Sequence, residues 1–110
     1  MKPKVICICG STRFVDLHAI AKWEFETEGN ICLMISYLPQ WYAEKKDYQG
    51  HDHFAEQEGK KELLDELHLR KIDLADEIFV INKDGYIGES TFNEIEYAIK
   101  QGKPIKYLEE

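Results

Sequence analysis

The chain alternates between short apolar runs and longer stretches in which apolar residues recur every three or four positions. Short runs rich in Val and Ile are typical of strands covered on both faces, and the longer spacing is typical of helices. The apolar runs are residues 4–9, 31–37, 77–82 and 104–108. The helical spacing covers residues 14–28, 60–74 and 90–101. The pattern therefore predicts four strands joined by helices in regular alternation.

This alternation predicts the fold class. Strand–helix–strand units close right-handed and build a parallel sheet with helices on both faces. We expect one α/β domain over residues 1–110, a small flavodoxin-like or Rossmann-like three-layer sandwich with a parallel sheet of about four strands. Ligands of such sheets bind beyond the carboxyl ends of the strands. The segments predicted to lie there are 10–14, 38–58 and 83–91.

Residues 38–58 break the regular pattern, with a proline, aromatic residues, clustered charges and a glycine. A segment of this length and composition predicts an irregular functional loop or lid. Trp41 and Tyr42 either stack on a base there or pack beneath the loop. His51 and His53 offer two metal ligands, but no third ligand stands at a suitable spacing, so the pattern favours solvated histidines.

Composition and charge narrow the classes of partner. The chain has 110 residues, 44% of them apolar and 32% charged, with a formal net charge of −7. Nucleic-acid polymers are bound mainly through Lys and Arg, so this charge disfavours them, although one small phosphorylated ligand is still compatible. No secretory signal and no apolar stretch of membrane-spanning length is seen. We therefore expect a cytoplasmic protein without membrane association.

The three cysteines, Cys7, Cys9 and Cys32, lie in apolar, strand-like surroundings. An odd count in such surroundings favours reduced cysteines in the core of a cytoplasmic protein. Cys7 and Cys9 share one face of the first strand, but C-x-C alone is a weak metal signal. We expect no metal site and no cofactor, since the Walker A and G-x-G-x-x-G patterns are also absent.

The segment Gly10-Ser11-Thr12-Arg13 follows the first strand and opens a helix. Free backbone N–H groups, the helix dipole, two hydroxyls and a guanidinium converge there, which suits a phosphate. The alternative is that Ser11 or Thr12 only caps the helix and Arg13 is solvated. This short pattern, taken alone, favours the second interpretation.

The turn before the last helix, "GYIGESTFNE", raises a similar choice. Gly85 and Gly88 allow a tight turn and a close backbone approach to a ligand, and Ser90 lies beside them. Thr91 and Glu94 match a capping box, with Thr91 as N-cap. The same spacing places the Glu94 carboxylate one turn into a helix at the strand ends. Spacing alone favours the capping role.

His68 belongs to a helical stripe with Leu64 and Ile72, each four residues apart. A histidine on an apolar helix face is more often a half-buried packing residue than a catalyst. No arrangement of a nucleophile with a nearby base stands out along the chain.

Two blocks of the sequence resemble the nucleoside 2-deoxyribosyltransferase superfamily, which includes the 2′-deoxynucleoside 5′-phosphate N-hydrolases. They are "ICGSTRF" near the start and "ADEIFVINKDGYIGESTFNEIEYAIKQGKPI" near the end. The matching positions of the second block are Ala75, Asp76, Glu94, Tyr97, Ala98, Gly102 and Lys103. The resemblance spans nearly the whole chain except residues 38–58, and its second block is the more specific.

The resemblance implies cleavage or transfer at an N-glycosidic bond. Glu94 occupies the position of the glutamate that attacks C1′ of the sugar and forms a glycosyl-enzyme ester. Gly10, Ser11, Thr12 and Arg13 match the loop that holds phosphate in the hydrolase branch. Tyr97 matches a supporting tyrosine. It also implies a homo-oligomer, because family members generally self-associate with composite sites.

His68 stands where the resemblance implies a helper aspartate. This histidine either donates a proton to the departing base or marks chemistry that is altered or lost. Three hypotheses therefore stand: an enzyme acting on a nucleoside or nucleoside 5′-monophosphate, a non-catalytic nucleotide-binding module, and a structural partner protein.

Overall fold

A computed structural model of the chain describes residues 2–45 and 60–110. Its centre is a four-stranded, fully parallel sheet in the order β2-β1-β3-β4. The strands are β1 (Val5–Gly10), β2 (Ile31–Leu33), β3 (Glu77–Ile81) and β4 (Ile105–Tyr107). β1 and β3 pair along their whole length, from Ile6 opposite Glu77 to Gly10 opposite Ile81. The sheet is thus centred on this pair.

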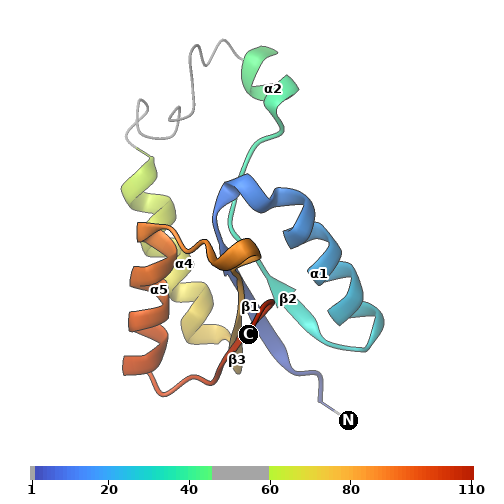
Figure 1. Cartoon of the computed structure of the whole chain (residues 1–110), viewed down its shortest axis with the longest axis vertical. Helices are drawn as coiled ribbons and strands as arrows, with labels where there is room; N and C mark the ends of the chain where they lie inside the picture. Colours follow the sequence, from blue (N-terminus) through green and yellow to red (C-terminus); the bar gives the residue numbers. More distant parts are fainter. Residues whose placement is uncertain (1, 46–59) are drawn as a thin grey trace.

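Helices cover both faces of the sheet (Figure 1), with α1 on one face and α4 and α5 on the other. The helices are α1 (Val15–Thr27), α2 (Gln40–Lys45), α4 (Lys61–Leu74) and α5 (Glu89–Lys100). Two 3-10 turns, η1 (Thr12–Phe14) and η2 (Lys83–Gly85), follow β1 and β3. The three-layer α/β architecture predicted from the alternation of runs is confirmed.

The core consists of two halves, because side chains alternate between the faces of a strand. Ile6 and Ile8 of β1 face α1, whereas Cys7 and Cys9 face α4 and α5. Each of these four side chains is at most 2% exposed. The continuous apolar run of β1 is therefore explained by helices packed on both of its faces.

The Ala75-Asp76 step has a clear structural role at the start of β3. Ala75 is buried where α4 ends, and the Asp76 carboxylate accepts a hydrogen bond from the Val5 N–H at 2.8 Å. In return, the Asp76 N–H donates to the Val5 carbonyl at 2.7 Å. The pair of bonds fixes the first residues of β1 and β3 in register.

Two predicted boundaries are wrong. The strand expected over residues 31–37 ends at Leu33, and the next carbonyl, that of Met34, accepts a hydrogen bond from Lys71 Nζ at 2.6 Å. Within the segment expected to be irregular, residues 40–45 form the short helix α2, which opens directly after Pro39. His51 and His53 lie outside the described residues.

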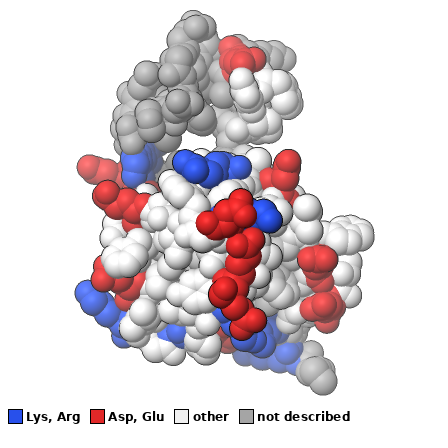
Figure 2. Space-filling view, in the orientation of Figure 1, with Lys and Arg blue, Asp and Glu red and all other residues white. Residues whose placement is uncertain are grey.

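The surface carries charges of both signs. On the face shown in Figure 2, acidic side chains form a band down the middle, and basic ones lie in small separate groups. A positively charged stripe of the kind that follows a nucleic-acid backbone is not seen on the described part of this face. None of the described helices is long and apolar enough to span a bilayer.

Candidate functional site

A cleft of about 390 Å³ opens at the carboxyl edge of the sheet. It lies where the chain crosses from one side of β1 to the other, because β2 and β3 flank that strand. This is the position at which open parallel sheets bind ligands. Its lining residues come from segments 10–12, 35–36 and 86–91 and from α4 and α5. Two of the three segments predicted to surround the site, 10–14 and 83–91, thus contribute residues to it.

Glu94 faces this cleft from the second turn of α5. Its side chain is buried, and its Oε1 atom lies 3.6 Å from His68 Nε2. Oε1 makes no hydrogen bond within residues 2–45 and 60–110. Burial raises the pKa of the Glu94 carboxyl to about 7, and the positive charge of His68 opposes that rise. The carboxyl therefore changes charge near neutral pH.

The predicted capping box is wrong. α5 begins at Glu89, and its N-cap is Gly88, which has an extended backbone and no side-chain cap. Thr91 is inside the helix and is buried. Glu94 is therefore too far along the helix to serve as a capping-box acid, and its carboxylate is directed to the cleft instead. This separates Glu94 from its most common structural role.

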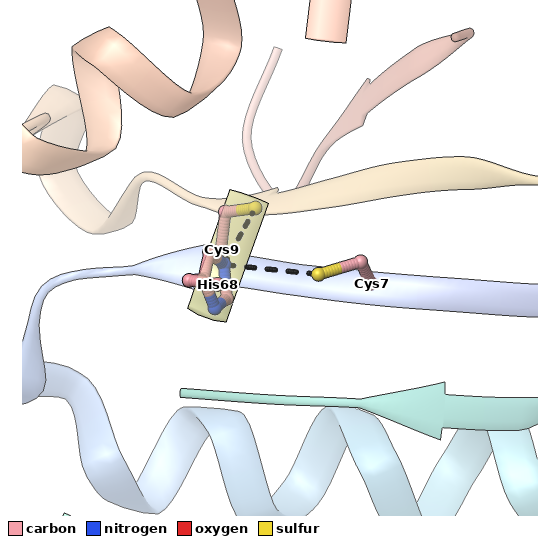
Figure 3. Close-up of side chains that lie close together, drawn as sticks. All are labelled: Cys7, Cys9 and His68. Carbon is pink, nitrogen blue, oxygen red and sulfur yellow. Dashed lines mark hydrogen bonds between the residues drawn. The ribbon is translucent and has the colours of Figure 1, made fainter. Parts of the chain in front are cut away.

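His68 contacts Glu94 and the two thiols of β1, and Figure 3 shows its contacts with the thiols. Its Nε2 atom lies 3.4 Å from Cys9 Sγ and 3.7 Å from Cys7 Sγ. Burial lowers the pKa of His68, but hydrogen bonding to Cys7 and the charges of Glu94 and Cys7 raise it by more, so that the net shift is upward. The negative charges of Glu94 and Cys7 thus stabilise the protonated form of His68.

Cys7 and Cys9 are free, buried thiols, as the sequence predicted. Their mutual hydrogen bond lowers the pKa of Cys7 to about 6 and raises that of Cys9 well above its ordinary value. What the sequence did not reveal is their third neighbour. His68 is 59 residues from Cys9 in the chain, and only the packing of α4 on β1 brings the two together.

Gly10, at the end of β1, has no space for a side chain. A Cβ atom there would lie 2.9 Å from Cβ of Ile81 and 3.0 Å from Cε1 of His18. Ser11 Oγ accepts a hydrogen bond from the Arg13 N–H at 3.2 Å and so caps η1. Gly10, Ser11 and Thr12 all line the cleft. The loop therefore both caps a turn and contributes to the site.

The remaining predicted site residues divide into two groups. Gly88 and Ser90 line the cleft, together with Tyr86. Arg13, Gly85 and Tyr97 do not line it. The Arg13 guanidinium lies over the ring of Tyr86, which lines the cleft, at 3.8 Å from the ring centroid.

Tyr97 has partners of its own outside the cleft. Its hydroxyl donates to Asp73 Oδ1 at 2.6 Å and accepts a hydrogen bond from Arg70 at 3.1 Å. These bonds join α5 to the last turns of α4. Tyr97 can therefore support the site by holding the two helices that carry Glu94 and His68.

A second hollow, of about 440 Å³, lies along α1 beside Phe79 and Leu108. Its charged lining residues are Glu24 and Glu28, and both are exposed. Convergent buried polar groups mark functional sites more reliably than volume does. The cleft that contains Glu94 and His68 is therefore the candidate site.

Comparisons with protein-family models, curated protein sequences and solved structures found no match to this chain. The resemblance to the nucleoside 2-deoxyribosyltransferase superfamily therefore stays a prediction from the sequence motifs.

Proposed function

We propose that this protein cleaves or transfers the N-glycosidic bond of a nucleoside or, preferentially, a nucleoside 5′-monophosphate, with Glu94 as the nucleophile. The observation that carries this proposal is the direction of one side chain. The Glu94 carboxylate faces the cleft at the strand ends, beside His68. Such a buried, perturbed carboxyl in a cleft is a typical catalytic group.

The proposed reaction needs a carboxylate and an acid. Ionised Glu94 attacks C1′ of the sugar, the bond from C1′ to the base nitrogen breaks, and the base leaves with that electron pair. Protonated His68 donates its proton to the departing base as the general acid. Water, or a second base, then attacks C1′ of the glycosyl ester and gives its proton to the now neutral His68, and the Glu94 carboxylate is released.

Groups suited to a phosphate line the same cleft as this pair. The hydroxyls of Ser11, Thr12 and Ser90 line the cleft, and α5 begins there without a side-chain cap. The first N–H groups of a helix attract anions. A cleft of this volume suits a small molecule, in agreement with the preference for a nucleotide monomer over a polymer.

Free base released from a panel of nucleosides and nucleoside 5′-monophosphates, measured by chromatography, tests the proposal. We expect release by the wild type and a loss of at least about 100-fold in Glu94→Gln, as for the removal of a catalytic nucleophile. Glu96→Gln is the matched control, because Glu96 is exposed on the same helix. If no substrate yields more base with the wild type than with Glu94→Gln, the enzymatic proposal is abandoned.

The second candidate function is a nucleotide-binding module without turnover. A pKa of about 7 leaves roughly half of the Glu94 carboxyl protonated at neutral pH, which weakens it as a nucleophile. This candidate predicts that a nucleotide raises the melting temperature without release of base, and that Glu94→Gln keeps the effect. Base release that depends on Glu94 would exclude it.

A further inference from the structure

The contact between β1, α4 and α5 brings together four side chains with metal-ligating atoms. Cys7 and Cys9 come from one face of β1, His68 from α4 and Glu94 from α5. The ligand atoms of Cys7, Cys9 and His68 all lie within 4.8 Å of one another. The proposed reaction uses His68 and Glu94 but gives the two thiols no role.

The distances suit a tetrahedral ion. Zinc bonds of about 2.3 Å to sulfur and about 2.0–2.1 Å to nitrogen and oxygen imply ligand separations of about 3.5 Å for sulfur to nitrogen and about 3.4 Å for nitrogen to oxygen. From His68 Nε2, the observed separations are 3.4 Å to Cys9, 3.7 Å to Cys7 and 3.6 Å to Glu94 Oε1. The ligand atoms of Cys7, Cys9 and His68 lie within 4.8 Å of one another, and the Glu94 carboxylate adjoins this group through its contact with His68.

The ligand set and its surroundings select the class of ion. Two thiolates, an imidazole and a carboxylate are ligands of zinc and of neighbouring transition metals, whereas magnesium and calcium prefer oxygen. The four side chains are buried, and their backbones belong to a strand and two helices. Sites on such elements hold ligand geometry better than sites on loops.

Charge and hydrogen bonding agree with this ligand set. Two thiolates and one carboxylate around a divalent ion leave a net charge of −1. Lys71, one turn after His68 on α4, lines the same cleft, and its positive charge opposes that net charge. Glu94 Oε1 has no hydrogen-bond partner in the described part of the chain, and an ion would provide its partner. We propose that Cys7, Cys9, His68 and Glu94 form a tetrahedral site for a zinc ion.

Zinc binding would replace the protons on the two thiols, and those that His68 and Glu94 carry near neutral pH, with bonds to the metal, and the displaced protons would pass to solvent. The site does not depend on the proposed reaction. It does use the same carboxylate, so the zinc-bound form would be unable to attack a sugar through Glu94. Zinc would then inhibit base release while stabilising the fold.

Zinc affinity of the full chain, freed of metal by a chelator, tests the site. We expect one zinc ion per chain and, in competition with a chromogenic chelator, an affinity that falls about 100-fold or more in Cys7→Ser and Cys9→Ser. Cys32→Ser is the matched control, because Cys32 is a buried cysteine on β2 outside the cluster. We expect it to keep the wild-type affinity. Equal affinity in all four proteins would overturn the proposal.

Cobalt substitution of the wild type gives a test that does not need the variants to fold. Cobalt bound at this site should show thiolate charge-transfer absorption and the intense visible bands of a tetrahedral ion, and zinc should abolish both. Zinc should also raise the melting temperature of the wild type by about 10 °C or more at saturation. Weak visible bands without charge transfer would show an octahedral ion on surface carboxylates, and would exclude the proposed site.

Discussion

Replacing Glu94 with glutamine should stabilise the metal-free protein, and by an amount that depends on pH. The Glu94 carboxyl has a pKa of about 7 in the folded protein against an ordinary pKa of 4.5, chiefly because it is buried. A raised folded pKa means that the folded state binds the proton more tightly than the unfolded state. The free energy of unfolding is therefore highest below pH 4.5 and decreases as the pH rises towards 7.

The magnitude follows from these two pKa values. The shift of about 2.5 units corresponds to about 3 kcal/mol of stability lost once the carboxyl is fully ionised in both states. At pH 5 only about 1 kcal/mol is lost, because this pH is only about half a unit above the pKa of the unfolded carboxyl. Glutamine has a similar shape and no charge, so Glu94→Gln avoids this loss. Its advantage over the wild type should grow from about 1 kcal/mol at pH 5 to about 3 kcal/mol at pH 8.5.

Urea unfolding at pH 5 and pH 8.5, followed by circular dichroism with a chelator present, measures this difference. Glu96→Gln is again the control, because the exposed Glu96 on the same helix should show little change at either pH. A wild type as stable as Glu94→Gln at pH 8.5, or more stable, would refute the inference that the buried carboxylate destabilises the fold.

Three further predictions follow from the site and its support. Gly10→Ala should destabilise the fold by about 1–3 kcal/mol in urea unfolding, because the added Cβ would clash with β3 and α1; wild-type stability would contradict this. Base release should rise with pH through about 7 as Glu94 ionises and fall at higher pH as His68 loses its proton, and a rate that is flat in pH would exclude this pair. Asp76→Ala should cost about 0.5–1.5 kcal/mol, because it removes the solvent-exposed hydrogen bond between the Val5 N–H and the carboxylate; an unchanged unfolding midpoint would refute that role.

The layers of the fold could be predicted because β1 and β3 are continuous apolar runs, and such runs need helices on both faces. The end of β2 could not be predicted in the same way. Residues 34–37 have strand-like composition, but the Met34 carbonyl pairs with Lys71 instead of continuing the ladder. Pairing across the sheet depends on tertiary contacts that local sequence does not contain. The short helix α2 is a similar case, since six residues carry little periodic signal.

The segments that line the candidate site could be predicted from the sequence, but the contacts between its side chains could not. The carboxyl ends of parallel strands meet at one edge of the sheet, so residues 10–12 and 86–91 could be placed together from topology alone. The cluster of Cys7, Cys9 and His68 could not. Its two signals, the C-x-C spacing and the helical stripe through His68, were both visible in the sequence. That α4 packs against the cysteine face of β1 appears only in the structure.

The two proposals explain the same feature of the molecule, a buried carboxyl without a hydrogen-bond partner for Oε1 among the described residues. A cost of about 3 kcal/mol is a large part of the 5–15 kcal/mol that stabilises a typical domain. An apolar side chain at position 94 would avoid that cost, so we expect a ligand that offsets it. The sugar carbon of a nucleotide and a zinc ion are both electron-poor partners for this oxygen. The variant Cys7→Ser distinguishes the two proposals. It should lose zinc binding and should still release base in a reaction that depends on Glu94.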